Sequence, residues 1–248
     1  MEGLSNVGPR IIMTLGDGSI MVTETVFFAV IVAAVIAITC VWLAKDLKKQ
    51  PTKKQVIAEF IVEFIYNMTK KTMGNHNVGY SPYIGTIFMF ILLGSCLGIM
   101  GWRPVSADVN LTFALAIMTF FVINVSSFKS MGFKGKLKHM CEPYPFMFPL
   151  KVIEMISQPV SLGFRLFGNI LGGFIVMTLL YGGLASACHA LAYSIPLFHI
   201  PWLEAVFPLP ALLFFDVFHP IVQAYIFTML TMVFISMEVI KHGDGEHK

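Results

Sequence analysis

The sequence predicts an all-α integral membrane protein with about five membrane-crossing helices and one amphipathic surface helix. Hydrophobic residues make up 56% of the 248 positions and charged residues 12%, whereas soluble proteins average roughly 45–50% and about 25%. The apolar residues gather in runs close to or beyond the ~20 residues that a helix needs to cross ~30 Å of hydrocarbon. We therefore expect residues 1–248 to form a single membrane domain.

The first span is expected at residues 22–44, where an apolar run ends before five lysines within residues 45–54. No charged region precedes this run and no small-residue cleavage site follows it. We therefore interpret it as a retained span and not as a signal peptide.

Residues 55–73 are expected to form the amphipathic helix. Apolar side chains recur there at helical spacing (Val56, Phe60, Phe64 and Met68), with glutamates and lysines among the other positions. Such a helix lies along a membrane surface or packs on other protein, and the pattern leaves both interpretations open.

Two further spans are expected at residues 83–102 and 111–128. A basic loop with four lysines between residues 129 and 138 should follow them. Residues 103–110, which include Pro, Asp and Asn, are the expected loop between the two spans.

The last two apolar segments, residues 146–184 and 211–240, are too long for upright spans. At 1.5 Å per residue they reach about 58 Å and about 45 Å, against ~30 Å of hydrocarbon. A break at Pro159 or an extension beyond the membrane would also accommodate the first of them. Little polar sequence is present to support an extension. We prefer strong tilt, because a steeply inclined helix would place Arg165, sixteen residues past Pro149, near the middle of the membrane.

The distribution of basic residues orients the chain. Fourteen of the seventeen fall in or beside residues 45–71, 129–151 and 241–248, and only Arg10 and Arg103 fall in the opposite set of loops. The positive-inside rule then predicts five crossings, with the N-terminus outside and the C-terminus in the cytoplasm.

The remaining basic residue, Arg165, lies inside the apolar run 146–184. Three polar residues flank Arg165 at helical spacing: Ser161 and Asn169 lie four residues before and after it, and Gln158 lies three residues before Ser161. All four side chains therefore share one helix face. Gly168, Gly172 and Gly173 are expected to leave this side of the helix thin, so that another helix can approach closely.

A second polar stripe is expected in residues 211–240, where Asp216, His219 and Gln223 share a face. Pro220 cannot donate the backbone hydrogen bond that would engage the carbonyl of Asp216, which leaves an acceptor for water or an ion. Two polar stripes on neighbouring helices predict a hydrated path for protons or other cations.

Other functions are alternatives to a hydrated path. A salt bridge between Arg165 and Asp216 would make the stripes a mere link between helices, but a central arginine costs ~2.5–3.5 kcal/mol. An independent secondary transporter is the main alternative function, although no internal repeat is present. The sequence carries no hydrolase elbow and no phosphate-binding loop. We expect no metal or cofactor, no nucleic-acid partner, and four cysteines that serve as apolar fillers.

Three runs are more specific than these patterns. They are Gln-Pro-Val-Ser-Leu-Gly-Phe-Arg-Leu-Phe-Gly-Asn at 158–169, Gln-Ala-Tyr-Ile-Phe-Thr-Met-Leu-Thr at 223–231 and Pro-Val-Ser-Ala-Asp-Val-Asn-Leu-Thr-Phe-Ala-Leu-Ala at 104–116. Together they resemble subunit a of the rotary F-type ATP synthase, and the similarity extends from about residue 52 to residue 240.

The resemblance implies a stator subunit of the Fo motor, which couples ion translocation to ATP synthesis. Arg165 corresponds to the essential arginine, Asn169 to its neighbour one turn on, and Gln223 to the facing glutamine. The family implies two aqueous half-channels and a rotor c-ring whose carboxylates exchange H⁺ or Na⁺. Arginine suits this task because it does not release its own proton in proteins.

The resemblance also implies partners and a location. The partners are the c-ring, the peripheral-stalk subunit b and the remaining ATP synthase subunits, within membrane lipid. The chain is expected to bind no nucleotide directly and to catalyse no reaction alone. The location implied is a bacterial plasma membrane.

Three positions depart from the family pattern. Phe174 stands where many relatives have a glutamate, Asp216 where many have histidine, and Lys151 where an acidic residue is common. We expect Asp216 with His219 to line the outer half-channel. One turn after Lys151, Glu154 either lines the inner exit or extends to the surface.

Overall fold

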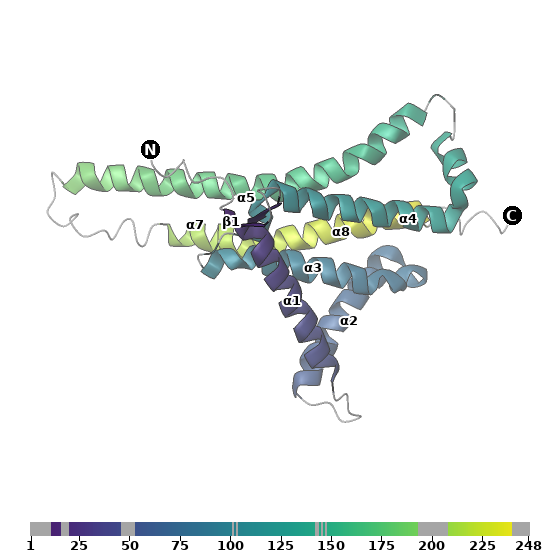
Figure 1. Ribbon diagram of the computed structural model, residues 1–248, viewed down its shortest axis with the longest axis horizontal. Helices are drawn as coiled ribbons and strands as arrows, with labels where there is room; N and C mark the ends of the chain where they lie inside the picture. Colours follow the sequence, from purple (N-terminus) through teal and green to yellow (C-terminus); the bar gives the residue numbers. More distant parts are fainter. Residues whose placement is uncertain are drawn as a thin grey trace.

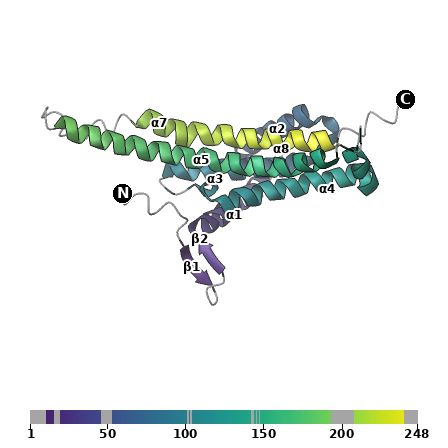
Figure 2. The ribbon, with the colours of Figure 1, turned by 90° about the horizontal axis from the view of Figure 1, so that it is seen from above.

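Helices dominate the computed structural model, which describes residues 11–15, 20–45, 53–100, 102, 104–141, 144, 146, 148–192 and 208–239. Within these ranges five helical segments are long and apolar enough to cross a membrane: Glu24–Ala44, Asn75–Met100, Val109–Lys138, Phe148–Cys188 and Leu209–Val239. The predicted all-α membrane fold is therefore confirmed. One small addition, which the apolar pattern did not predict, is an antiparallel hairpin of β1 (Ile11–Leu15) and β2 (Ile20–Thr23) before the first helix (Figure 2).

Helix α1 (Glu24–Ala44) crosses the other long helices at a steep angle (Figure 1). Only Thr25, Ala29 and Val32 are buried on it, so most of its apolar surface is left for lipid. Its N-terminal half is held by aromatic packing, because the rings of Phe28 and Trp102 stack with 5.3 Å between their centroids.

Helix α2 (Lys53–Met73) is the predicted amphipathic helix, and it packs on protein along part of its length. Ile65, Met68 and Met73 are buried in a cluster with residues of the following helix and of the last helix. Phe60, nearer the N-terminus of α2, is 70% exposed. One end of α2 is therefore covered by protein, and the other presents an apolar face outward.

Helix α3 (Ser81–Cys96) follows a short 3₁₀ helix, η2 (Asn75–Tyr80), and continues into another, η3 (Leu97–Met100). A third 3₁₀ turn, η4 (Val105–Ala107), leads into helix α4. Helices α3, α4, α5 and α8 lie alongside one another as a bundle (Figures 1 and 2).

Helix α4 (Val109–Cys141) is longer than the predicted span, and the predicted basic loop is wrong. The chain remains helical on both sides of Gly132, whose positive φ of 69° interrupts the helix and redirects it. Glycine adopts this conformation without steric cost. Lys134 and Lys136 consequently sit on a short helical segment and not in an irregular loop.

Helix α5 (Phe148–Ala192) runs for 45 residues, and Pro159 does not end it. At 1.5 Å per residue it is about 67 Å long, longer than the predicted segment 146–184. It bends along its course in Figure 1, and an internal proline is a common cause of such bends.

The last segment comprises α7 (Leu209–Leu213), a π-helical turn η7 (Phe214–Phe218) and α8 (His219–Val239). In the π turn the backbone N–H of His219 donates to the carbonyl of Phe214, five residues earlier. Such widened turns often occur at functional sites, and this one carries Asp216.

The core between α3, α4, α5 and α8 fixes the orientation of α5. Leu162 and Leu166 pack there against Ala224 and Phe227 of α8, against Ala116 of α4 and against Ile87 and Ile91 of α3. Because these two leucines are turned inward, the residues directly before them are turned outward.

Candidate ion-translocation site

Arg165 lies on the uncovered face of α5. Leu162 and Leu166 are 2% and 0% exposed, whereas Ser161 and Arg165 are exposed. Among the residues that the structure describes, Arg165 has no hydrogen-bond or ion-pair partner, and the salt bridge to Asp216 weighed above is not formed. The guanidinium is thus directed away from the bundle within an apolar helix.

Asn169 and Gln223 are brought together by the packing of α5 on α8. The Nδ2 of Asn169 donates a hydrogen bond of 2.7 Å to the Oε1 of Gln223, which is 2% exposed. The Nε2 of Gln223 is buried and has no partner among the described residues. An unsatisfied buried donor costs ~1–3 kcal/mol, so this amide is available to another group.

The three glycines that follow Arg165 most closely on α5, Gly168, Gly172 and Gly173, do not play the same part. A Cβ at Gly173 would lie 2.9 Å from Cδ1 of Phe215, so this glycine permits the close approach of the π turn. Gly168 and Gly172 have nothing within 4 Å of such a Cβ, and both are exposed. The predicted close approach therefore occurs at one glycine, while the other two leave a smooth open stripe beside Arg165.

Asp216 and His219 are half-buried near the end of α3. A Cβ at Gly98 would lie 3.7 Å from Oδ1 of Asp216, which places the carboxylate against the η3 turn. The Nε2 of His219 is buried without a partner among the described residues. Asp216 and Gln223 are seven positions apart, which corresponds to a rise of about 10 Å along the helix. The carboxylate of Asp216 and the amide of Gln223 therefore belong to two separate parts of the stripe.

Glu154 and Gln158 lie at the opposite end of the α5 stripe. Glu154 is exposed and pairs with Lys151 at 3.6 Å. Both Glu154 and Gln158 line a cavity of about 70 Å³ between α4, α5 and α8. Lys136 and Glu238 also line the cavity. Neither is among the predicted site residues.

A signal for these two residues was present in the sequence. Ionisable side chains within or beside apolar helices are commonly functional or paired. Glu238 stands in the apolar segment 211–240. Lys136 lies in the stretch that the sequence predicts as a loop, because the lysine pattern does not predict the turn at Gly132.

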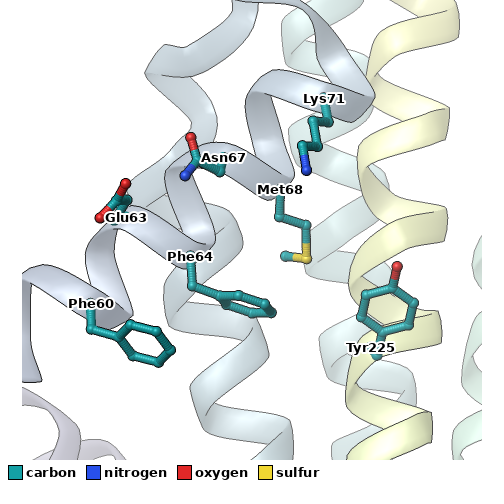
Figure 3. A pocket seen from close by; sticks show the side chains of 7 residues that line it. All are labelled: Phe60, Glu63, Phe64, Asn67, Met68, Lys71 and Tyr225. Atoms are coloured by element: carbon teal, nitrogen blue, oxygen red, sulfur yellow. The ribbon is translucent and has the colours of Figure 1, made fainter.

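A second cavity lies elsewhere, between α2 and α8 (Figure 3). Its volume is about 490 Å³. Phe60, Phe64 and Met68 form its wall on α2, and Tyr225 faces them from α8. None of the predicted ion-translocation residues lines it.

Residues 26–236 match the family described as ATP synthase A chain. The chain belongs to this family. It is similar to the ATP synthase subunit a of Propionigenium modestum, described as sodium ion specific, with 30% identity over 95% of this chain and 79% of the relative. It is 33% identical to subunit a of Moorella thermoacetica, over 77% of this chain and 79% of the relative. It is 32% identical to subunit a of Bacillus subtilis, over 84% and 88%.

Family membership establishes the function at a coarse level. The chain is a multi-pass membrane component of the ATP synthase Fo stator and takes part in ion translocation. An independent secondary transporter is not favoured.

Proposed function

We propose that Arg165 is the fixed positive charge past which the carboxylates of a rotating c-ring move. The observation that supports this is an arginine on the open face of α5, without a partner among the described residues, beside the smooth stripe of Gly168 and Gly172. A guanidinium in a medium of low dielectric favours the ionised form of a facing carboxylate. It therefore expels the bound H⁺ or Na⁺ and keeps its own proton.

Asn169 and Gln223 would position this exchange. Their hydrogen bond joins α5 to α8 directly beside the arginine stripe. The Nε2 of Gln223 is buried behind Asn169 without a partner among the described residues, so the amide keeps donor capacity next to the site of exchange. Ser161, one stripe position before Arg165, is exposed on the same face.

The outer half-channel is proposed to reach the ring past Asp216 and His219. The contact between Gly173 and Phe215 brings the turn that carries Phe174 alongside the turn that carries Asp216. Asp216 on η7 can therefore serve the place where an acidic group on α5 is missing. The unpartnered Nε2 of His219 supports a hydrated or proton-bearing site there.

The inner half-channel is proposed to pass Glu154 and Gln158. The chain would act with the c-ring, subunit b and the remaining ATP synthase subunits, without catalysing a reaction alone. Its N-terminus would lie outside and its C-terminus in the cytoplasm, as the lysine distribution indicates. The length of α5, about twice the hydrocarbon thickness, supports a steep tilt.

Replacement of Arg165 tests this proposal. The complete ATP synthase with Arg165→Gln, in inverted membrane vesicles, should lose ATP-driven ion pumping, because no fixed charge remains to discharge the ring. Lys129→Gln, an exposed cation on α4, is the control and should pump normally. Normal pumping by assembled Arg165→Gln complexes would refute the assigned role.

A further inference from the structure

The small cavity between α4, α5 and α8 has an unusually polar wall for a bundle of apolar helices. Its volume is about 70 Å³, and a single water molecule needs roughly 10–15 Å³ of such space. Polar side chains come to it from all three helices: Asn124 and Lys136 from α4, Lys151, Glu154 and Gln158 from α5, and Glu238 from α8. A polar cavity with room for several water molecules is expected to be hydrated.

Lys136 is built into this wall. The positive φ of Gly132 turns the chain so that Lys136 returns to the bundle, where it is 7% exposed. Its Nζ donates a hydrogen bond of 2.6 Å to Oδ1 of Asn124 and lies 4.5 Å from the ring centroid of Phe128. Burying a lysine is costly unless it is paired, so these contacts hold a charge at the cavity.

Glu238 brings the opposite charge from the last helix. One of its oxygens accepts a hydrogen bond of 2.7 Å from Oγ of Ser127, which fixes the carboxylate against α4. Glu238 and Lys136 share the cavity with the pair Lys151 and Glu154. The two positive and two negative side chains balance, so the cavity is charged locally but neutral overall.

The α5 wall of the cavity leads to the arginine. Glu154 and Gln158 line the cavity, and Ser161 and Arg165 continue the same helix face at three- and four-residue spacings. Gln158 and Arg165 are separated by a rise of about 10 Å. Among the residues of α5 that line the cavity, Gln158 is therefore the one closest along the helix to Arg165 and the open face.

We propose that ions enter and leave on the inner side through this cavity, behind α5, and that Lys136 and Glu238 are the charged residues that line the route. The proposal deepens the proposed function of Arg165 and rests on it. Glu238 holds and orients the water that carries the ion, and Lys136 keeps the carboxylate and Asn124 in place. The route then passes Gln158 to the face that carries Arg165.

Access of a water-soluble thiol reagent tests the route. The complete ATP synthase is prepared with the four cysteines of this chain replaced by alanine, in inverted vesicles whose cytoplasmic side faces the medium. Single cysteines are placed at Met155 and Gln158, which line the cavity, and at Ile156, which is exposed outside it. A membrane-impermeant, positively charged methanethiosulfonate is then added, which reacts with thiolates that water can reach.

We expect Met155→Cys and Gln158→Cys to react at least about tenfold faster than Ile156→Cys, because a thiol in lipid does not ionise. Modification at either cavity position should also block ATP-driven pumping. Ser161→Cys reports on the alternative, a route confined to the open face. Reaction at Ser161→Cys with none at Met155→Cys and Gln158→Cys would overturn the cavity route.

Substitutions of Lys136 and Glu238 give an independent test. Glu238→Gln should slow ATP-driven pumping by about threefold or more, while Glu238→Asp should restore it, because the charge and not the shape is required. Lys136→Met should also slow pumping, and Lys134→Met, an exposed lysine on the same segment, should not. Equal pumping by Glu238→Gln and the native complex would refute the role of Glu238.

Failure of this proposal is distinguishable from failure of the proposed function. Loss of pumping in Arg165→Gln with unreactive cavity cysteines would leave the arginine role intact and remove the cavity route. Normal pumping in Arg165→Gln would remove both.

Discussion

Two adjacent glycines of α5 provide a matched test of which helix face is covered. Gly173→Ala places a Cβ 2.9 Å from Cδ1 of Phe215, whereas Gly172→Ala meets nothing within 4 Å. Ordinary contacts begin near 3.4 Å, so the ring of Phe215 must shift by about 0.5 Å, and overpacking of this kind costs ~1–3 kcal/mol.

Both substitutions gain the same helix propensity, up to ~1 kcal/mol each. The difference between the two variants therefore isolates the contact with Phe215. Gly173→Ala should be less stable than Gly172→Ala by ~1–3 kcal/mol, measured as denaturant unfolding of the purified chain in detergent micelles. Equal stabilities, or a less stable Gly172→Ala, would contradict the assignment of the inner and outer faces.

The same pair separates stability from function. Gly172→Leu should not lower the unfolding free energy of the chain, because the stripe is open in the chain itself and leucine gains helix propensity over glycine. In the complete ATP synthase it should nevertheless lower ATP-driven pumping, since the rotor is proposed to pass over this stripe. Native pumping by Gly172→Leu would place the rotor on another face.

Three further outcomes are expected. Asn169→Leu should destabilise the chain by ~1–3 kcal/mol, because Gln223 is left buried without its partner; the double variant with Gln223→Leu should cost less than the sum of the single ones in denaturant unfolding. Asp216→Asn should slow ion-coupled turnover in vesicles and leave assembly intact, and adding Phe174→Glu should partly restore turnover; unchanged pumping by Asp216→Asn would refute its assignment to the outer half-channel. Met73→Ala should destabilise the chain by ~2–5 kcal/mol, and a smaller loss would show that α2 is not anchored by its C-terminal end.

Much of the site was predictable because helical periodicity is a local property. The spacings of Ser161, Arg165 and Asn169 follow from 3.6 residues per turn, whatever surrounds the helix. The same is true of His219 and Gln223 on α8, whereas Asp216 lies on the widened π turn before it. Local pattern also located the five long apolar helices, since each needs only length and composition to be recognised.

The parts that were not predictable depend on contacts between distant segments. The pattern of α5 did not reveal which of its glycines meets another helix, because that depends on where Phe215 is carried by the π turn. The basic loop was wrong for a related reason. A single glycine with positive φ returns Lys136 to the bundle, and its hydrogen bond to Asn124 joins residues twelve positions apart.

The sequence by itself determined the membrane class, the number of long apolar helices, the two polar stripes and the family. Only the tertiary structure decided that Arg165 faces outward, that Gln223 is buried against Asn169, and that Lys136 and Glu238 share one cavity. The physical reason is that helix period assigns residues to a common face, whereas neighbouring helices from elsewhere in the chain decide which face is covered.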